Sequence, residues 1–259
     1  MTTEAVTESP THRHIHRYSQ VHLELQPHRS TDDANDHDYS NANKHHYDDL
    51  EAERMDERAD ANVMGKLIGK LMLDAYPFAD DQTVVLDFAC GTGIISRQLV
   101  SSTRRIIGVD ISDAMVRRYN LRADWQGLAP EEMHAICTDL EHSPEGLDGE
   151  RFDVIVCASS YHHFDSIESV TNTLASYLKP GGVLLVTDIA QRADNTEVIS
   201  HPHAHIVAHR RGFSPAEMES VFIAAGLVDV RVNGRAIENV KVHGHDVNIF
   251  LAKGVKPSS

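Results

Sequence analysis

The residues of this sequence best suited to chemistry lie in a short loop that follows a run of apolar residues. The loop, residues 87–93, reads DFACGTG and leads directly into the helix-like segment IISRQLV. Small residues let a ligand approach the backbone, and the start of a helix favours an anionic group. The next apolar run, IIGVD, ends in Asp110, 17 residues after Gly93. A carboxylate there can bind both hydroxyls of a ribose, so the pattern predicts a site for a nucleoside cofactor.

Two residues of this region narrow the choice of cofactor. A strict dinucleotide-binding fingerprint needs a third glycine at position 96, which is Ser96. The carboxylate of Asp87 would repel a pyrophosphate, whereas it would attract an ammonium or a sulfonium group. The loop therefore favours a cationic nucleoside cofactor over a nicotinamide or flavin cofactor.

The elements that must position these residues are strands alternating with helices. Five short runs rich in Val and Ile follow residue 82: TVVLDF, RRIIGVDI, MHAICTDL, FDVIVCAS and GGVLLVTDI. Helices are expected at 167–178 and from Ser214, where Ser-Pro-Ala-Glu is a start signal. Two further strand-like runs, at 227–232 and 246–254, are joined without a helix and should pair antiparallel. The predicted fold class is α/β: a doubly wound, Rossmann-like sheet of seven mostly parallel strands with an antiparallel last strand.

The N-terminal part of the sequence divides into a tail and a helical region. Residues 1–39 are rich in His and lack a sustained apolar period, which predicts a disordered tail, and residues 40–259 are interpreted as one domain. One solvent-facing helix is expected over 44–60, followed by an amphipathic helix that Pro77 ends. Its expected buried face comprises Val63, Met64, Leu67, Ile68, Leu71, Met72 and Ala75. The domain's predicted parts are N-terminal helices (40–78), a cofactor-binding core (83–190), an insertion (191–213) and the last helix and strands (214–259).

The composition argues against several classes of partner. The chain has 24 Lys and Arg against 39 Asp and Glu, a net charge of −15, which disfavours nucleic acid. No apolar run approaches the roughly 20 residues of a membrane span, and a signal-peptide pattern is missing, so no membrane partner is expected. The three cysteines are too few and too scattered for a disulfide framework, which favours a reducing compartment, the cytoplasm. Nothing in the sequence specifies an oligomeric state.

Five ordered segments carry a family resemblance. VVLDFACGTG closely resembles the cofactor loop of the class I S-adenosylmethionine-dependent methyltransferases, and GVDISDAM, CTDLE, FDVIVCASSYHHF and LKPGGVLLVTDI resemble their second to fifth strand segments. GFSPAEMESVFIAAGLVDVRV resembles their last helix and sixth strand, so the resemblance spans residues 45–253. The sequence is similar to the small-molecule methyltransferases of the ubiquinone-biosynthesis, arsenite and natural-product type. Many members have a glycine where this chain has Ala89, so a slightly less permissive backbone is expected there.

The resemblance implies S-adenosylmethionine as the cofactor and S-adenosylhomocysteine as its product. It assigns cofactor contacts by the part of the cofactor that they meet: Asp87, Ala89, Gly91 and Gly93 around the methionine, Asp110 at the ribose, Ile111 and Met115 beside the adenine, Asp139 and Leu140 at its amino group, and Ala158 beside the methyl group. For Met115, Asp139 and Leu140, a purely structural role in a core or a turn is the alternative.

Two adjacent histidines are candidate catalytic residues. The segment SSYHHF follows the fourth strand, where the resemblance implies the methyl position. A His with a pKa near neutrality suits a general base for a hydroxyl acceptor. We therefore expect His162 or His163 to line the pocket; capping of the next helix or a loop hydrogen bond is the alternative.

In the resembling family, N-terminal helices and insertions such as 191–213 cover the substrate. Tyr47, His46 and His205 are accordingly candidates for a lid that contacts the substrate. His205 and His209 have the spacing of two metal ligands on one helix, but polar lid residues without a metal are the interpretation adopted, and no metal is expected.

The function implied by the resemblance is methyl transfer from S-adenosylmethionine to a small-molecule acceptor by in-line displacement. A protein methyltransferase and a non-catalytic cofactor-binding regulator are alternatives, and a nicotinamide-dependent oxidoreductase is disfavoured by Ser96 and Asp87. The segment after the fourth strand lacks an Asn-Pro-Pro-Tyr-like run and an acidic pair. The patterns of adenine-, glutamine- and arginine-directed methyltransferases are thus missing, and the acceptor atom stays open.

Overall fold

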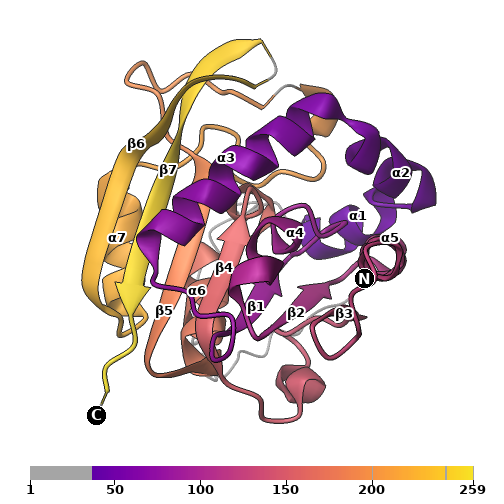
Figure 1. The fold of residues 1–259 in the computed structure, drawn as a ribbon. Coiled ribbons are helices and arrows are strands. Elements are labelled where there is room, and N and C mark those ends of the chain that lie inside the picture. Colours follow the sequence, from indigo (N-terminus) through magenta and orange to yellow (C-terminus); the bar gives the residue numbers. More distant parts are fainter. Residues whose placement is uncertain (1–36, 200, 243, 259) are drawn as a thin grey trace, which may run out of the picture. The chain divides into compact units, whose positions relative to one another are not determined.

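The computed structural model describes residues 37–199, 201–242 and 244–258, and they contain a single seven-stranded sheet (Figure 1). Its strands are β1 (Val84–Phe88), β2 (Arg105–Asp110), β3 (Met133–Cys137), β4 (Phe152–Ala158), β5 (Leu178–Ile189), β6 (Val228–Val242) and β7 (His245–Val255). They lie in the order β3-β2-β1-β4-β5-β7-β6, and only the pairings that involve β7 are antiparallel. The predicted fold class is confirmed. Of the expected tail, residues 1–36 lie outside the described residues.

Helices cover both faces of the sheet because its central strands are buried on both sides. On one face, Ile68 of α3 (Ala59–Ala75) and Leu99 of α4 (Ser96–Leu99) pack with Val85 of β1. The long helix α5 (Asp113–Trp125) lies on the same face, against β2 and β3. On the other face, helices α6 (Ile167–Tyr177) and α7 (Pro215–Ala224) pack with Leu86, the next residue of β1. The alternation along β1 thus divides the core into two layers (Figure 1).

The N-terminal helices differ from the prediction. The single helix expected over 44–60 is replaced by α1 (Tyr39–His46), α2 (Asp49–Glu57) and the start of α3. Asp48 separates α1 from α2. Its side chain accepts a hydrogen bond from the backbone N–H of Glu51 and so caps the start of α2. Arg58 then takes an extended conformation and separates α2 from α3. Local capping overrides the high helix propensity of the acidic run.

The buried face of α3 is also only partly as predicted. Val63 and Leu67 are 58% and 45% exposed, whereas Gly65 and Gly69 are buried. A Cβ added at Gly65 would lie 2.2 Å from the side chain of Ile94, so the glycines let α3 approach the segment that leads into α4. The spacing of apolar residues predicted the wrong buried face, because glycine has no apolar side chain to mark the positions at which α3 makes its contacts.

Two elements have lengths that the sequence did not predict. The helix expected over 94–100 is reduced to the four residues of α4 and a short 3-10 turn. In contrast, β6 runs well past residue 232, with irregular pairing to β7 where Asp229 and Asn239 adopt positive φ. Helix α7, on the other hand, begins as predicted: Ser214 and Glu217 form a reciprocal capping box. Within the described part of the chain, no helix is both long and apolar enough to cross a membrane.

Candidate cofactor and acceptor site

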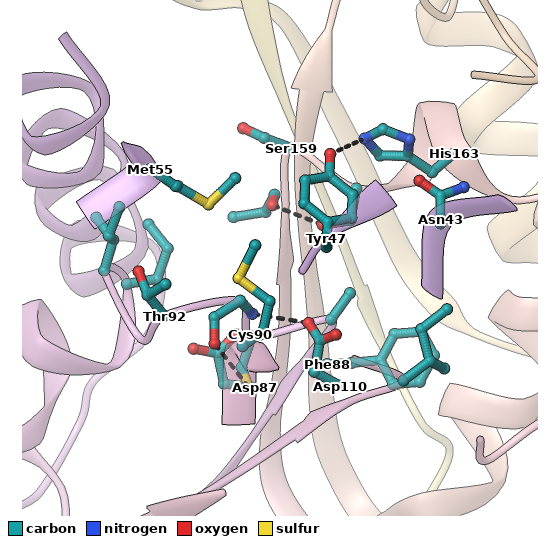
Figure 2. Close-up of a pocket in the computed structure, with 18 of the residues that line it drawn as sticks. Asn43, Tyr47, Met55, Asp87, Phe88, Cys90, Thr92, Asp110, Ser159 and His163 are labelled. Atoms are coloured by element: carbon teal, nitrogen blue, oxygen red, sulfur yellow. Dashed lines mark hydrogen bonds between the residues drawn. The ribbon is translucent and has the colours of Figure 1, made fainter. Parts of the chain in front are cut away.

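A cavity of about 950 Å³ lies at the carboxyl ends of the central parallel strands. The loops after β1, β2 and β4 form its floor, and residues of α1 to α3 and the end of β6 line the rest of its wall. Ligands of open α/β sheets bind at this edge, and the volume is at the upper end of the roughly 300–1,000 Å³ typical of small-molecule sites. Figure 2 shows that Asp87 and Asp110 lie at one end of the site and Tyr47, His163 and Asn43 at the other.

Nine of the ten residues expected to contact the cofactor line this cavity. They are Asp87, Ala89, Gly91, Asp110, Ile111, Met115, Asp139, Leu140 and Ala158. Met115 belongs to α5, and the other eight come from four different strands or the loops after them, so the strand order of the sheet brings them together. Gly93 is the exception and lies behind the cavity wall.

Asp110 organises the loops on both sides of it. Its Oδ2 accepts a hydrogen bond of 2.9 Å from the backbone N–H of Gly91, and its Oδ1 accepts one of 2.9 Å from that of Ser112. Burial raises the pKa of the Asp110 carboxyl, and the N–H groups of Ser112 and Gly91 act in the opposite direction. Each oxygen has a further lone pair for a ligand, so the carboxylate can link the glycine loop to a bound ribose.

Asp87 is fully buried beneath the glycine loop. Its Oδ2 accepts a hydrogen bond of 2.6 Å from the hydroxyl of Ser96, the residue that takes the place of the missing third glycine. Burial raises the pKa of Asp87 to about 7, although the Ser96 hydrogen bonds lower it. A cation placed nearby would stabilise the ionised form.

The glycine loop leaves room for a ligand against its backbone. Gly91 has φ of 51°, and a Cβ added there would meet only the sulfur of Met55, at 3.8 Å. Ala89 adopts φ of 55°, a conformation in which a side chain is disfavoured, as its substitution for glycine led us to expect. The hydroxyl of Thr92 is buried, lines the cavity and has no hydrogen-bond partner among the described residues. The carboxylates, the open backbone and this unpaired hydroxyl fit a nucleoside cofactor with a cationic group.

Gly93 supports the loop from behind, and its replacement tests this role. With φ of 80°, a Cβ there would lie 2.7 Å from the ring of the fully buried Tyr119. Gly93→Ala should therefore lower the free energy of unfolding by roughly 2–4 kcal/mol, from backbone strain and overpacking together. Gly127→Ala is the matched control, because Gly127 has φ of 72° and open space around it. Equal losses in the two variants, measured by urea denaturation, would contradict the packing role.

A chain of hydrogen bonds connects Tyr47 to the 191–213 segment. His163 Nδ1 lies 2.6 Å from the backbone oxygen of Ile206, which can only accept, so Nδ1 carries the proton. Burial lowers the pKa of His163 to about 3, with the neighbouring His162 ring acting in the same direction. The ring is thus neutral and its Nε2 accepts from the Tyr47 hydroxyl at 3.2 Å (Figure 2). His163 is accordingly a hydrogen-bond acceptor and a weak base.

The other candidate catalytic histidine turns away from the cavity. His162 Nδ1 lies 2.8 Å from Oδ1 of Asp188, a fully buried carboxylate at the end of β5. Burial opposes ionisation of Asp188, but the His162 ring and the N–H groups of His162 and Ile189 hold its pKa below the usual value. His162 therefore fixes the turn after β4 to β5, which is the loop hydrogen-bonding alternative for this residue.

Two of the three lid candidates do not line the cavity. Tyr47 does, but His46 and His205 lie beside each other outside it, with ring centroids 5.5 Å apart. The residues around His205 and His209 form turns rather than a helix, so the i, i+4 geometry of two metal ligands on one helix does not occur. Among the described residues, no group of three or more His, Cys, Asp or Glu is arranged to hold a metal ion.

Several wall residues escaped the sequence analysis. Asn43 of α1 donates from Nδ2 to the backbone oxygens of Tyr39 and Ile206, at 2.8 and 3.0 Å, and its buried Oδ1 is without a partner in the described chain. Met55 of α2 and residues 240–242 of β6 also line the cavity. These residues lie far in the sequence from the loops that form the floor of the cavity. Their local sequence therefore gave no signal beyond the position of α1 and α2 before the cofactor loop.

A buried charge cluster fixes α2 next to the site. The carboxylate of Asp56, with 1% side-chain exposure, pairs with Arg97 at 3.2 Å, with Arg118 at 3.0 Å and with Arg122. Arg97 also donates to the backbone oxygen of Thr92, at 2.6 Å, and so joins the cluster to the glycine loop. The neighbouring Met55 thereby takes its place in the cavity wall.

Comparisons with known proteins agree with this geometry. Residues 85–182 match a family described as a methyltransferase domain. An uncharacterized methyltransferase of Schizosaccharomyces pombe is 36% identical over 168 residues, which are 61% of this chain and 58% of that protein. The ubiquinone biosynthesis O-methyltransferase of Histophilus somni is 30% identical over 105 residues, 40% and 44% of the two chains. The match thus spans about half the length of these curated relatives.

Solved structures agree on the fold. Magnesium protoporphyrin IX methyltransferase from Synechocystis PCC 6803, solved with bound SAH, has a TM-score of 0.61 at 16% identity and covers 85% of this chain and 100% of its own. Residues 85–182 are thus similar to the methyltransferase-domain family, and the chain shares the fold of a solved methyltransferase.

Proposed function

We propose that this protein transfers a methyl group from S-adenosylmethionine to a small-molecule acceptor. The observation that carries the proposal is the cavity itself, which joins the carboxylates of Asp87 and Asp110 to a second polar group, Tyr47 and His163, inside one largely apolar enclosure. The first group suits a cationic nucleoside, and the second lies where an acceptor would meet the methyl group. Its volume accommodates a small acceptor beside the cofactor.

The residues of the site divide the work of methyl transfer between them. Asp110 accepts hydrogen bonds from the ribose, and the open backbone at Gly91 receives the methionine part beside the charge of Asp87. The bound cofactor supplies an electrophilic methyl group on a sulfonium. Tyr47, held by His163 and by the Ser112 hydroxyl that donates to its backbone oxygen at 2.5 Å, orients the acceptor. Ala158 and the apolar wall exclude water, so positioning is the main contribution of the protein.

Calorimetry with S-adenosylmethionine and S-adenosylhomocysteine tests the cofactor assignment directly. We expect both to bind with one site per chain. If neither binds to the folded full-length chain, the proposed function is wrong. Detectable NADH binding in the same experiment would favour the oxidoreductase alternative instead.

The class of acceptor is tested separately from the cofactor. Labelled-methyl transfer is measured into a small-molecule extract and, in parallel, into a protein fraction of the same extract. We expect label in the small molecules only. Label in proteins would identify a protein methyltransferase, and cofactor binding without label in either fraction would favour the non-catalytic regulator.

The raised pKa of Asp87 predicts a pH dependence of cofactor binding. Below pH about 7 the buried carboxyl of the free protein is protonated, and binding a cation must then release that proton. Affinity for S-adenosylmethionine should therefore rise between pH 5.5 and 7, by at most about tenfold per pH unit, and level off above. Calorimetry in buffers of different ionisation enthalpy counts the released protons. Asp87→Asn should remove this dependence, and a variant with the same pH profile as the native chain would contradict it.

A further inference from the structure

Three polar side chains on the acceptor side of the cavity, Tyr47, Asn43 and Ser160, offer acceptors rather than donors. Because the Ile206 oxygen fixes the proton on Nδ1 of His163, Nε2 is the acceptor for the Tyr47 hydroxyl. The proton of that hydroxyl is therefore used, and only oxygen lone pairs face a ligand. Figure 2 shows the Tyr47 hydroxyl directed at His163, with Ser159 on the other side of it.

Neighbouring side chains have the same polarity. The Nδ2 group of Asn43 donates one hydrogen bond to the backbone oxygen of Tyr39 and one to that of Ile206. These two bonds fix the orientation of the amide and leave its Oδ1 unpaired among the described residues. The hydroxyl of Ser160 donates to the backbone oxygen of Ala158, at 3.0 Å, which again leaves lone pairs.

The basic side chains of the cavity wall are already neutralised. Among the described lining residues, Arg58 forms two hydrogen bonds with Asp60, Lys241 lies 2.7 Å from Asp246, and His142 lies 2.8 Å from Asp139. The fourth, His163, is held neutral by burial.

The acidic side chains are not balanced in the same way. Asp87, Asp110, Glu141 and Asp165 line the cavity and form no ion pair with a described residue. Burial raises the pKa of each of these four carboxyls; Asp87 and Asp110 are deeply placed, whereas Glu141 and Asp165 lie at the exposed rim. A bound cofactor with one positive charge would not outweigh these four carboxylates, so the region would carry no excess of positive charge. A carboxylate or phosphate on the acceptor would find no free cation among the described lining residues.

We infer that the methyl acceptor is a largely apolar molecule without negative charge that donates a hydrogen bond to Tyr47 through a hydroxyl or an amine. The inference rests on the proposed methyl transfer and specifies its substrate class. It separates this site from methyltransferase sites built to hold acids, in which basic or donor groups would face the acceptor. Tyr47 acts here as a positioning residue that selects the acceptor through its oxygen.

The test separates the acceptor pool by charge before the reaction. A small-molecule extract is divided by ion exchange into anionic, neutral and cationic fractions, and each is incubated with the full-length chain and methyl-labelled S-adenosylmethionine. We expect at least about tenfold more label in the neutral or the cationic fraction than in the anionic one. Label in the neutral fraction identifies a hydroxyl or neutral amine, and label in the cationic fraction an ammonium-bearing acceptor. Label mainly in anionic molecules overturns the inference while leaving methyl transfer intact; no label in any fraction removes the proposed function and this inference with it.

Variants add a readout that a structural role would not change. Tyr47→Phe should raise KM for the labelled acceptor about threefold to tenfold, the loss of one hydrogen bond, and leave the affinity for S-adenosylhomocysteine unchanged. Tyr76→Phe is the control, because Tyr76 packs against Phe78 outside the cavity. Asp165→Asn removes one wall charge and should raise the share of label in anionic acceptors at least about threefold. An unchanged KM in Tyr47→Phe, or an unchanged share in Asp165→Asn, contradicts the inference.

Discussion

Replacing Asp110 by Ala is expected to weaken S-adenosylmethionine binding at least about 100-fold. On the proposed function, the variant loses two hydrogen bonds that the ribose would donate to a charged acceptor, which contribute roughly 1.5–3 kcal/mol each. It also frees the backbone N–H groups of Gly91 and Ser112, which the carboxylate now holds at 2.9 Å. The glycine loop and the start of α5 then lose their common anchor, which adds to the loss. Calorimetry on the folded variant measures the effect.

Two further variants make this result specific. Asp110→Asn keeps one acceptor oxygen and should show an intermediate loss of about tenfold. Asp124→Ala changes an exposed carboxylate on α5 that lies outside the cavity and should bind the cofactor like the native chain. Affinity within threefold of native in a folded Asp110→Ala would remove the ribose assignment and, with it, much of the case for the cofactor.

Removal of the Asp56 carboxylate should produce the largest loss of stability. Asp56→Ala leaves Arg97, Arg118 and Arg122 close together, with side-chain exposures of 12%, 19% and 28%, and without their shared counter-charge. Breaking a buried pair of this kind costs roughly 3–5 kcal/mol, because the remaining charges are neither paired nor well hydrated. Urea denaturation at pH 7 should show this decrease in the free energy of unfolding.

A surface ion pair provides the comparison for the Asp56 cluster. Asp74 lies 2.6 Å from Lys70 on α3 and is 64% exposed, so Asp74→Ala should cost no more than about 1 kcal/mol. Both variants delete one aspartate, but Asp56 is buried and pairs with three arginines, whereas Asp74 is exposed and pairs with one lysine. A similar loss in the two would show that the buried cluster contributes no more than a surface pair.

The parts of the fold that could be predicted are those encoded locally. The continuous apolar run of β1 and the capping box at Ser214 each depend on residues a few positions apart. The convergence of the cofactor residues followed from one rule, that ligands bind at the carboxyl ends of parallel strands. The break at Asp48 was missed, although an aspartate cap is also a local signal, because an acidic helix and a capped helix start share the same residue types.

Tyr47 and His163 were candidates from the sequence, but the hydrogen bonds of the acceptor side could not be predicted because they are long-range. The hydrogen bond between Asn43 and Ile206 joins residues 163 positions apart, and that between Tyr47 and His163 joins residues 116 apart. Sequence alone also could not distinguish His162 from His163, since adjacent residues of the short turn point in different directions. His162 turns away from the cavity because it binds the buried carboxylate of Asp188, which lies on β5 and is 26 positions away in the sequence.

The carbonyl of Ile206, which receives both His163 and Asn43, belongs to the main chain. Side-chain substitution at position 206 therefore leaves that oxygen in place, whereas an insertion or deletion in the segment moves it. The proposed acceptor site should thus tolerate side-chain substitutions between 191 and 213 and be sensitive to changes in loop length. Lengthening or shortening this segment offers evolution, or an engineer, a route to new acceptors that leaves the cofactor-binding strands untouched.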